Sequence, residues 1–218
     1  MMAKRPIFIP IDSFPFVERV QVEFKWFPGF SKNQIAKSIL SLHESAAQLG
    51  IHPILEISSK SPEALGVSLS AFNLKISFSD MNPISVECAF QGSKVFQMGG
   101  PYNDLYCVSS REAKTDKRIR SSGRLVEFSL FGNKFPVEPV NAFYDWLYIV
   151  ALSQNSELSC RLVDFRGFSD IVFNPNKSSN CQARSAALFV SLDRLGQIES
   201  VVRDRDYYLS LITGKQPK

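Results

Sequence analysis

A carboxylate and an amine lie seven residues apart in one short stretch of the chain, at Glu87 and Lys94. If residues 85–96 form a helix, these side chains share one face with the ring of Phe90, because residues three or four apart stack on a helix. Ser85 suits the N-cap position of that helix. A paired acid and amine can transfer protons and attack an electrophilic carbon. The same spacing also fits an ordinary amphipathic helix whose Glu and Lys are solvated.

The composition is that of a globular protein. Of 218 residues 44% are hydrophobic, with 18 Phe, so the chain can bury a sizeable core. The four cysteines lie far apart without a Cys-x-x-Cys motif, so we expect reduced thiols and no structural zinc site. Prolines interrupt the first apolar stretch and Asp145 interrupts the best later one. We therefore expect neither a signal peptide nor a membrane-spanning segment, and predict a cytoplasmic protein.

The first 60 residues predict a strand-helix-strand unit. Apolar and polar residues alternate over 20–26, as in a half-buried strand. Apolar residues then recur at helical spacing over 31–50, and residues 54–57 predict a short strand. We predict that residues 1–60 form a small appendage packed on a main domain of residues 61–218.

The main domain mixes helices with short strands. Residues 74–78 and 168–173 favour extended structure, whereas 109–123 and 138–155 favour helices, and a last helix begins near residue 184. The expected fold class is therefore α+β and predominantly helical.

Basic side chains gather in residues 109–134. This window holds seven Lys and Arg against three acids, a net charge of +4 that equals the charge of the whole chain. The basicity is therefore local, as in a surface that contacts nucleic-acid phosphates, although a solvated helix face would give the same pattern. The candidates for phosphate contact are Arg111, Lys114, Arg118 and Arg124.

Other side chains suit a nucleotide ligand. Aromatic rings can stack on a base, although most rings at this density belong to a core. The polar loop 176–184 leads into a helix N-terminus, and the loop 58–62 carries hydroxyls and an amine, so both could bind an anion. The candidate substrate-binding residues are Lys60, Phe72, Asn73, Phe90, Trp146, Asn180, Gln182 and Arg184.

These motifs, in this order, resemble the NADAR family, whose fold is called YbiA-like. The matching segments are 69–73, Glu87 with Lys94, 122–124, 143–152, and Asp170 with Phe173. The resemblance spans residues 60 to 195. Within the family, the chain is most similar to the toxin-linked branch, the antitoxins encoded beside DarT-type DNA ADP-ribosyltransferases. The segments that carry this similarity are 69–74, 85–91, 142–148 and 173–183.

The resemblance implies an N-glycosidase that removes ADP-ribose from guanine bases in DNA and acts as antitoxin to a DarT-type toxin. Lys94 would attack the anomeric carbon of the ribose, which requires a desolvated, neutral amine. Glu87 would protonate the leaving base or help to open the ribose, and Asp170 would orient the ribose hydroxyls or Lys94. We expect no metal, cofactor or membrane partner.

Two alternatives stay open at this point. One is an N-glycosidase that acts on a small ribosylamino-pyrimidine phosphate of the riboflavin pathway. The other is a non-catalytic module that binds ADP-ribose.

Overall fold

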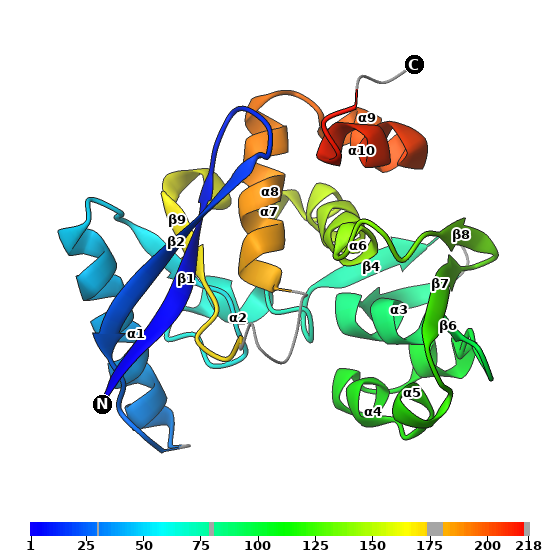
Figure 1. Ribbon diagram of the computed structural model, residues 1–218, viewed down its shortest axis with the longest axis horizontal. Coiled ribbons are helices and arrows are strands. Elements are labelled where there is room, and N and C mark those ends of the chain that lie inside the picture. Colours follow the sequence, from blue (N-terminus) through cyan, green and yellow to red (C-terminus); the bar gives the residue numbers. More distant parts are fainter. Residues whose placement is uncertain (30, 79–80, 174–180, 216–218) are drawn as a thin grey trace.

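The computed structural model describes residues 1–29, 31–78, 81–173 and 181–215, and Figure 1 shows their arrangement. Helices hold 44% of the residues and strands 22%, in several small sheets. The prediction of an α+β, predominantly helical fold is confirmed.

A four-stranded sheet combines the start of the chain with a strand from its second half. Its order is β2-β1-β9-β3. The strands are β1 (Met2–Pro10), β2 (Val17–Lys25), β3 (Ile54–Glu56) and β9 (Gly167–Ser169). Helix α1 (Lys32–Gln48) packs on β2, where Ile39 and Leu42 bury against Val22 and Phe24. The strand-helix-strand prediction for 20–57 is confirmed, and a domain boundary at residue 60 stays a prediction.

Strand β1 was not predicted, because Pro6 and Pro10 lie within it. It pairs with β2 along its length but with β9 only at Phe8. Proline has no N–H to donate to a neighbouring strand. It is therefore tolerated in the parts of a strand that pair with a neighbour on one side only.

Two smaller sheets follow. Strands β4 (Lys75–Phe78) and β5 (Met81–Ser85) pair antiparallel, which confirms the predicted strand at 74–78. Strands β6 (Lys94–Phe96), β7 (Leu125–Leu130) and β8 (Asn133–Phe135) form the third sheet.

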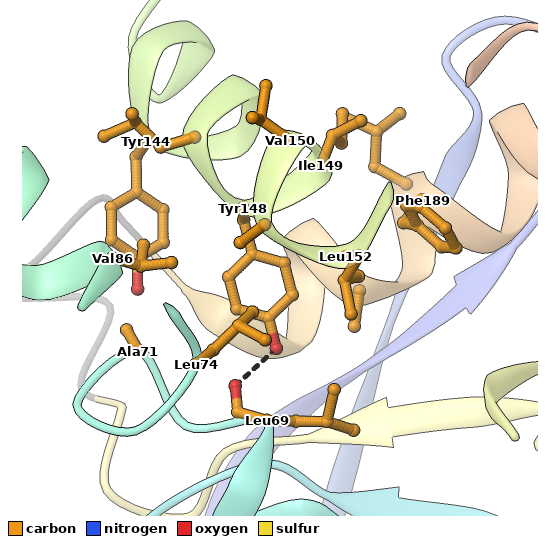
Figure 2. Close-up of a cluster of buried hydrophobic side chains, with 14 of the residues drawn as sticks. Leu69, Ala71, Leu74, Val86, Tyr144, Tyr148, Ile149, Val150, Leu152 and Phe189 are labelled. Atoms are coloured by element: carbon orange, nitrogen blue, oxygen red, sulfur yellow. Dashed lines mark hydrogen bonds between the residues drawn. The ribbon is translucent and has the colours of Figure 1, made fainter. Parts of the chain in front are cut away.

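Helix α6 (Ala142–Ser153) lies at the centre of the molecule, against α8 (Gln182–Arg194) and α3 (Val86–Gly92). In α6 nearly every residue is buried, so the helix is enclosed on all sides by the rest of the protein. Figure 2 shows the rings of Tyr144 and Tyr148 projecting from α6 toward the segment 69–74, where the Tyr148 hydroxyl donates to the Leu69 carbonyl at 2.7 Å.

Short helices complete the fold. They are α2 (Ala64–Ser68), α4 (Ser110–Thr115), α5 (Arg118–Ser121), α7 (Ser156–Ser159), α9 (Ile198–Arg203) and α10 (Arg205–Ile212), with 3-10 turns at Asn103–Cys107 and Leu162–Asp164. Helices α9 and α10 were not anticipated.

The helix predicted over 85–96 is wrong at its C-terminal end. Ser85 caps it as expected, accepting from the Cys88 N–H at 3.1 Å, but α3 ends at Gly92. Lys94 instead pairs with Phe128 of β7 as the first residue of β6. Sheet pairing with a distant segment has overridden the local helical pattern.

Two other helices are shorter than predicted. The helix expected over 109–123 breaks at Asp116, whose carboxylate accepts from the Arg118 N–H, and becomes α4 and α5. The helix expected over 138–155 begins only at Ala142, because Pro139 and a left-handed Asn141 precede it. The extended segment predicted over 168–173 is shorter as well, since β9 ends at Ser169.

Candidate active site

Glu87 and Lys94 are joined through the side-chain amide of Gln91. The amide nitrogen donates to Glu87 Oε1 at 2.8 Å, and Lys94 Nζ donates to the amide oxygen at 2.7 Å. Glu87 and Gln91 are both buried, and Lys94 is half-buried. The carboxyl and the amine therefore belong to one hydrogen-bonded chain at the junction of α3 and β6.

Burial makes the charged form of Lys94 less favourable than in an ordinary lysine, although an aromatic ring and a carboxylate nearby stabilise the ammonium. Its ammonium lies 4.4 Å from the centroid of the Phe90 ring. Burial lowers the pKa of Lys94 to about 8; Glu87 opposes this shift and Lys114 adds to it. With that pKa roughly a tenth of the amine is unprotonated at pH 7, hundreds of times more than for an ordinary lysine. Lys94 can thus act as a nucleophile near neutral pH.

Lys114 extends this cluster from α4. Its ammonium lies 3.8 Å from Glu87 Oε2 and 5.0 Å from the centroid of the Phe72 ring. The Lys114 side chain is 57% exposed. Lys114, proposed from the sequence as a phosphate contact, therefore stands at the rim of the Glu87–Lys94 cluster beside Phe72.

A hollow of about 220 Å³ lies beside Lys94. Its walls are mainly aromatic and aliphatic, and Lys94 and Asn141 supply polar groups. The lining residues are Phe90, Lys94, Leu125, Phe128, Val137, Val140, Asn141, Phe143 and Tyr144. Pockets for drug-sized ligands measure about 300–1,000 Å³, so this hollow is suited to a single planar ring.

Tyr144 lies close to both acidic groups of the predicted site. Burial raises its pKa well above the ordinary value, and the charges of Glu87 and Asp170 raise it further. The Tyr144 ring also meets Phe90 edge-on at 5.1 Å between centroids. Tyr144 therefore keeps a neutral hydroxyl in the field of both carboxyls.

Asp170 connects to Glu87 through a short chain of hydrogen bonds. Gln182 Nε2 donates to Asp170 Oδ2 at 3.1 Å, and the Gln182 oxygen accepts from the Ala71 N–H at 2.9 Å. The Glu87 N–H in turn donates to the Ala71 carbonyl at 2.9 Å. The structure thus joins three predicted residues, Asp170, Gln182 and Glu87, through the backbone of one residue.

A second buried carboxyl stands behind Asp170. Glu56 accepts from the Ser169 hydroxyl at 2.6 Å and from the Ile171 N–H at 2.9 Å, so it holds the residues on both sides of Asp170. Burial, and then the Glu56 charge, raise the pKa of Asp170 to about 7. His43 completes the group, with Nε2 at 2.9 Å from the Ser169 hydroxyl.

Several predicted binding residues lie elsewhere. Trp146 donates from Nε1 to the Val201 carbonyl and packs against Phe135, lining a different hollow from that of Lys94. Arg184 forms an ion pair with the buried Asp145. Asn73 is exposed and donates to the Val67 carbonyl. Lys60 is exposed on the turn after β3, and Asn180 lies outside the described residues.

The basic surface is partly neutralised. Arg118 pairs with Asp104 and Asp116 and lies over the Tyr102 ring at 4.5 Å. Arg111 and Arg124 are exposed. Of the four predicted phosphate contacts, these two are the more open to a ligand.

Three contributors to the site were given no role from the sequence: Glu56, Gln91 and Asn141. Gln91 follows Glu87 by four residues, a spacing at which side chains meet on a helix. No sequence signal pointed to Glu56 or Asn141, whose places depend on distant segments.

The fold is α+β, and the site joins a buried carboxyl and a half-buried amine through one amide, two groups whose chemistry allows proton transfer and attack on an electrophilic carbon. Comparison with known protein families identifies the family to which this chain belongs. A family model described as DarT1-associated NADAR antitoxin matches residues 3–218. The chain belongs to this NADAR family of antitoxins associated with a DarT toxin, which confirms the resemblance. No curated protein matches the chain.

Two further observations concern the described residues alone. No helix among them combines the length and apolar character needed to cross a membrane. Their His, Cys, Asp and Glu side chains form no group of three able to hold a metal ion.

Proposed function

We propose that the protein is an ADP-ribosyl glycohydrolase that removes ADP-ribose from guanine bases in DNA and so reverses the action of a DarT-type ADP-ribosyltransferase. The observation that carries this proposal is Lys94, an amine with a pKa of about 8 that is joined to a buried carboxyl through Gln91. Membership in a toxin-associated antitoxin family supports ADP-ribosylated DNA as the substrate.

In the proposed reaction, the neutral Lys94 amine adds to the anomeric carbon of the ribose as its bond to the guanine nitrogen breaks. Glu87 gives a proton to the departing guanine. Opening of the ribose ring turns the adduct into a Schiff base. Water then adds to the same carbon, the bond to Lys94 breaks, and the released proton returns to Glu87. One water is consumed for each ADP-ribose released.

The other residues bind and orient the substrate. Asp170, fixed by Gln182 and by the backbone N–H groups of Val172 and Phe173, orients the ribose hydroxyls. Phe72 offers a half-buried ring at the rim, with Lys114 above it. Arg111 and Arg124 contact DNA phosphates through exposed charges.

A guanine-ADP-ribosylated oligonucleotide tests the proposal. We expect Lys94→Ala and Glu87→Gln each to lower kcat/KM by at least a hundredfold, because each removes a group that acts on the reacting atoms. Lys37→Ala is the matched control, since Lys37 is exposed on α1, outside the basic surface and the site. Full activity of either site variant refutes the role given to that residue.

The covalent step has a separate test. Borohydride reduces a Schiff base to a stable secondary amine, so it should leave ADP-ribose attached to wild-type protein at Lys94. No adduct should form on Lys94→Ala. Tight ADP-ribose binding without turnover would instead identify a binding module, and turnover of a ribosylamino-pyrimidine phosphate alone would identify the metabolic alternative.

A further inference from the structure

Asn141 is an unusual residue in the wall of the hollow beside Lys94. Its backbone is left-handed, with φ 76° and ψ −14°, just before the first residue of α6. Residues other than glycine rarely adopt this conformation, and asparagine tolerates it better than most. The local backbone is therefore compatible with Asn or Gly at this position and strained with most other residues.

The side chain of Asn141 is not used to cap the helix. It makes no capping hydrogen bond to α6. Its Oδ1 atom is buried, and within the part of the chain that the structure describes it has no hydrogen-bond donor. Buried acceptors are nearly always satisfied, so this one, on a half-buried residue in the wall of a hollow, needs a donor that water or a ligand in the hollow can supply.

The rest of the hollow indicates what that ligand is. Phe90, Phe128, Phe143 and Tyr144 give it aromatic walls, which suit the faces of a planar ring. Its volume of about 220 Å³ accommodates one base and is too small for a whole nucleotide sugar. A planar ring with an N–H group at its edge matches both the walls of the hollow and the Asn141 acceptor.

We propose that this hollow receives the guanine base of the substrate and that Asn141 Oδ1 accepts a hydrogen bond from the N–H edge of that base. This inference rests on the proposed function. Guanine carries N–H donors beside a carbonyl oxygen, so an amide can accept from one and donate to the other.

Adenine in the ADP-ribose group also carries an N–H donor, but its position disfavours it. The bond that Lys94 breaks joins the guanine directly to the attacked carbon, so this base must lie next to Lys94. The adenine stands at the other end of the group, beyond the pyrophosphate. The hollow that Lys94 itself lines therefore suits the guanine.

Two variants isolate the side chain from the backbone. Asn141→Gly removes the amide, and glycine adopts the left-handed backbone conformation without steric strain. Asn141→Asp keeps an acceptor of the same size. We expect Asn141→Gly to lower kcat/KM on guanine-ADP-ribosylated oligonucleotide ten- to a hundredfold with an unchanged or higher melting temperature. Asn141→Asp should retain more activity than Asn141→Gly.

The affinity for free ADP-ribose, measured by calorimetry on the same variants, separates the two bases. Unchanged ADP-ribose affinity together with reduced turnover supports the guanine assignment. A parallel loss of ADP-ribose affinity assigns the hollow to the adenine or the ribose and overturns the proposal. Wild-type turnover of Asn141→Gly also overturns it. If the wild-type protein itself does not turn over the oligonucleotide, the proposed function is refuted. That outcome differs from a failure of the guanine assignment, in which the wild-type protein is active.

Discussion

Glu87 and Lys94 lie on opposite sides of one amide, that of Gln91, which accepts from the amine and donates to the carboxyl. The two groups do not share a helix, because α3 ends at Gly92 and Lys94 begins β6. Their relative position is therefore set by the turn between α3 and β6 and by the Gln91 side chain.

This arrangement predicts a role for Gln91 that can be measured. We expect Gln91→Ala to lower kcat ten- to a hundredfold, because Lys94 loses the acceptor that holds it and Glu87 loses a donor. Gln48→Ala, at an exposed position at the end of α1, serves as the control. A Gln91→Ala enzyme with wild-type kcat would show that the bridge has no part in catalysis.

The reactivity of Lys94 should depend on its protonation. Since only the neutral amine reacts and its pKa is about 8, the rate at which an amine-specific reagent labels Lys94, followed by mass spectrometry, should rise about tenfold per pH unit below pH 8 and level off above it. Lys114 lowers this pKa, so Lys114→Gln should move the midpoint of the Lys94 labelling profile to higher pH and slow the labelling at pH 7. Lys117→Gln should leave the midpoint of this pH profile unchanged. A profile that is flat between pH 6 and 9 would contradict the role of Lys94.

Stability should fall as Asp170 ionises. The folded-state pKa of Asp170 is about 7, above its ordinary value of 3.8, so its contribution is fully present below about pH 4 and is lost as the pH rises toward 7. Glu56→Gln removes one cause of the raised pKa. We therefore expect the difference in melting temperature between pH 5 and pH 8 to be smaller in Glu56→Gln than in wild type. An equal difference in both proteins would count against this coupling.

The ion pair between Arg184 and Asp145 predicts a loss of stability when one partner is removed. Asp145 is buried, and Arg184 and the Ser185 hydroxyl contact its oxygens. Arg184→Met leaves this carboxyl without its cation and should cost about 3–5 kcal/mol of unfolding free energy. Adding Asp145→Asn should recover part of the loss in denaturant unfolding. A stable Arg184→Met protein that has lost ADP-ribose affinity would support the substrate-binding role predicted for Arg184 from the sequence.

The sequence predicted those parts of the site that depend on local spacing. Ser85 marked the start of α3, and the separation of Glu87 from Phe90 placed both on that helix. The end of α3 could not be predicted, because Lys94 is drawn into a strand by Phe128, more than thirty residues later in the chain.

The binding residues were harder to assign for a similar reason. Phe143, Tyr144 and Trp146 follow closely on one helix, and only the packing of β7, β8 and α9 decides which of them meets Lys94. Likewise Arg184 had the charge to bind a phosphate, but its partner Asp145 lies 39 residues away in sequence.

The central claim is that the bond between ADP-ribose and guanine is cleaved with Lys94 as the nucleophile. Its most direct test is mass spectrometry of a guanine-ADP-ribosylated oligonucleotide after incubation with the protein. We predict that wild-type protein returns the strand to its unmodified mass, with the guanine in place and free ADP-ribose in solution, and that Lys94→Ala leaves the modified mass unchanged. An unchanged strand with wild-type protein, a strand that has lost its guanine, or full cleavage by Lys94→Ala would contradict the account.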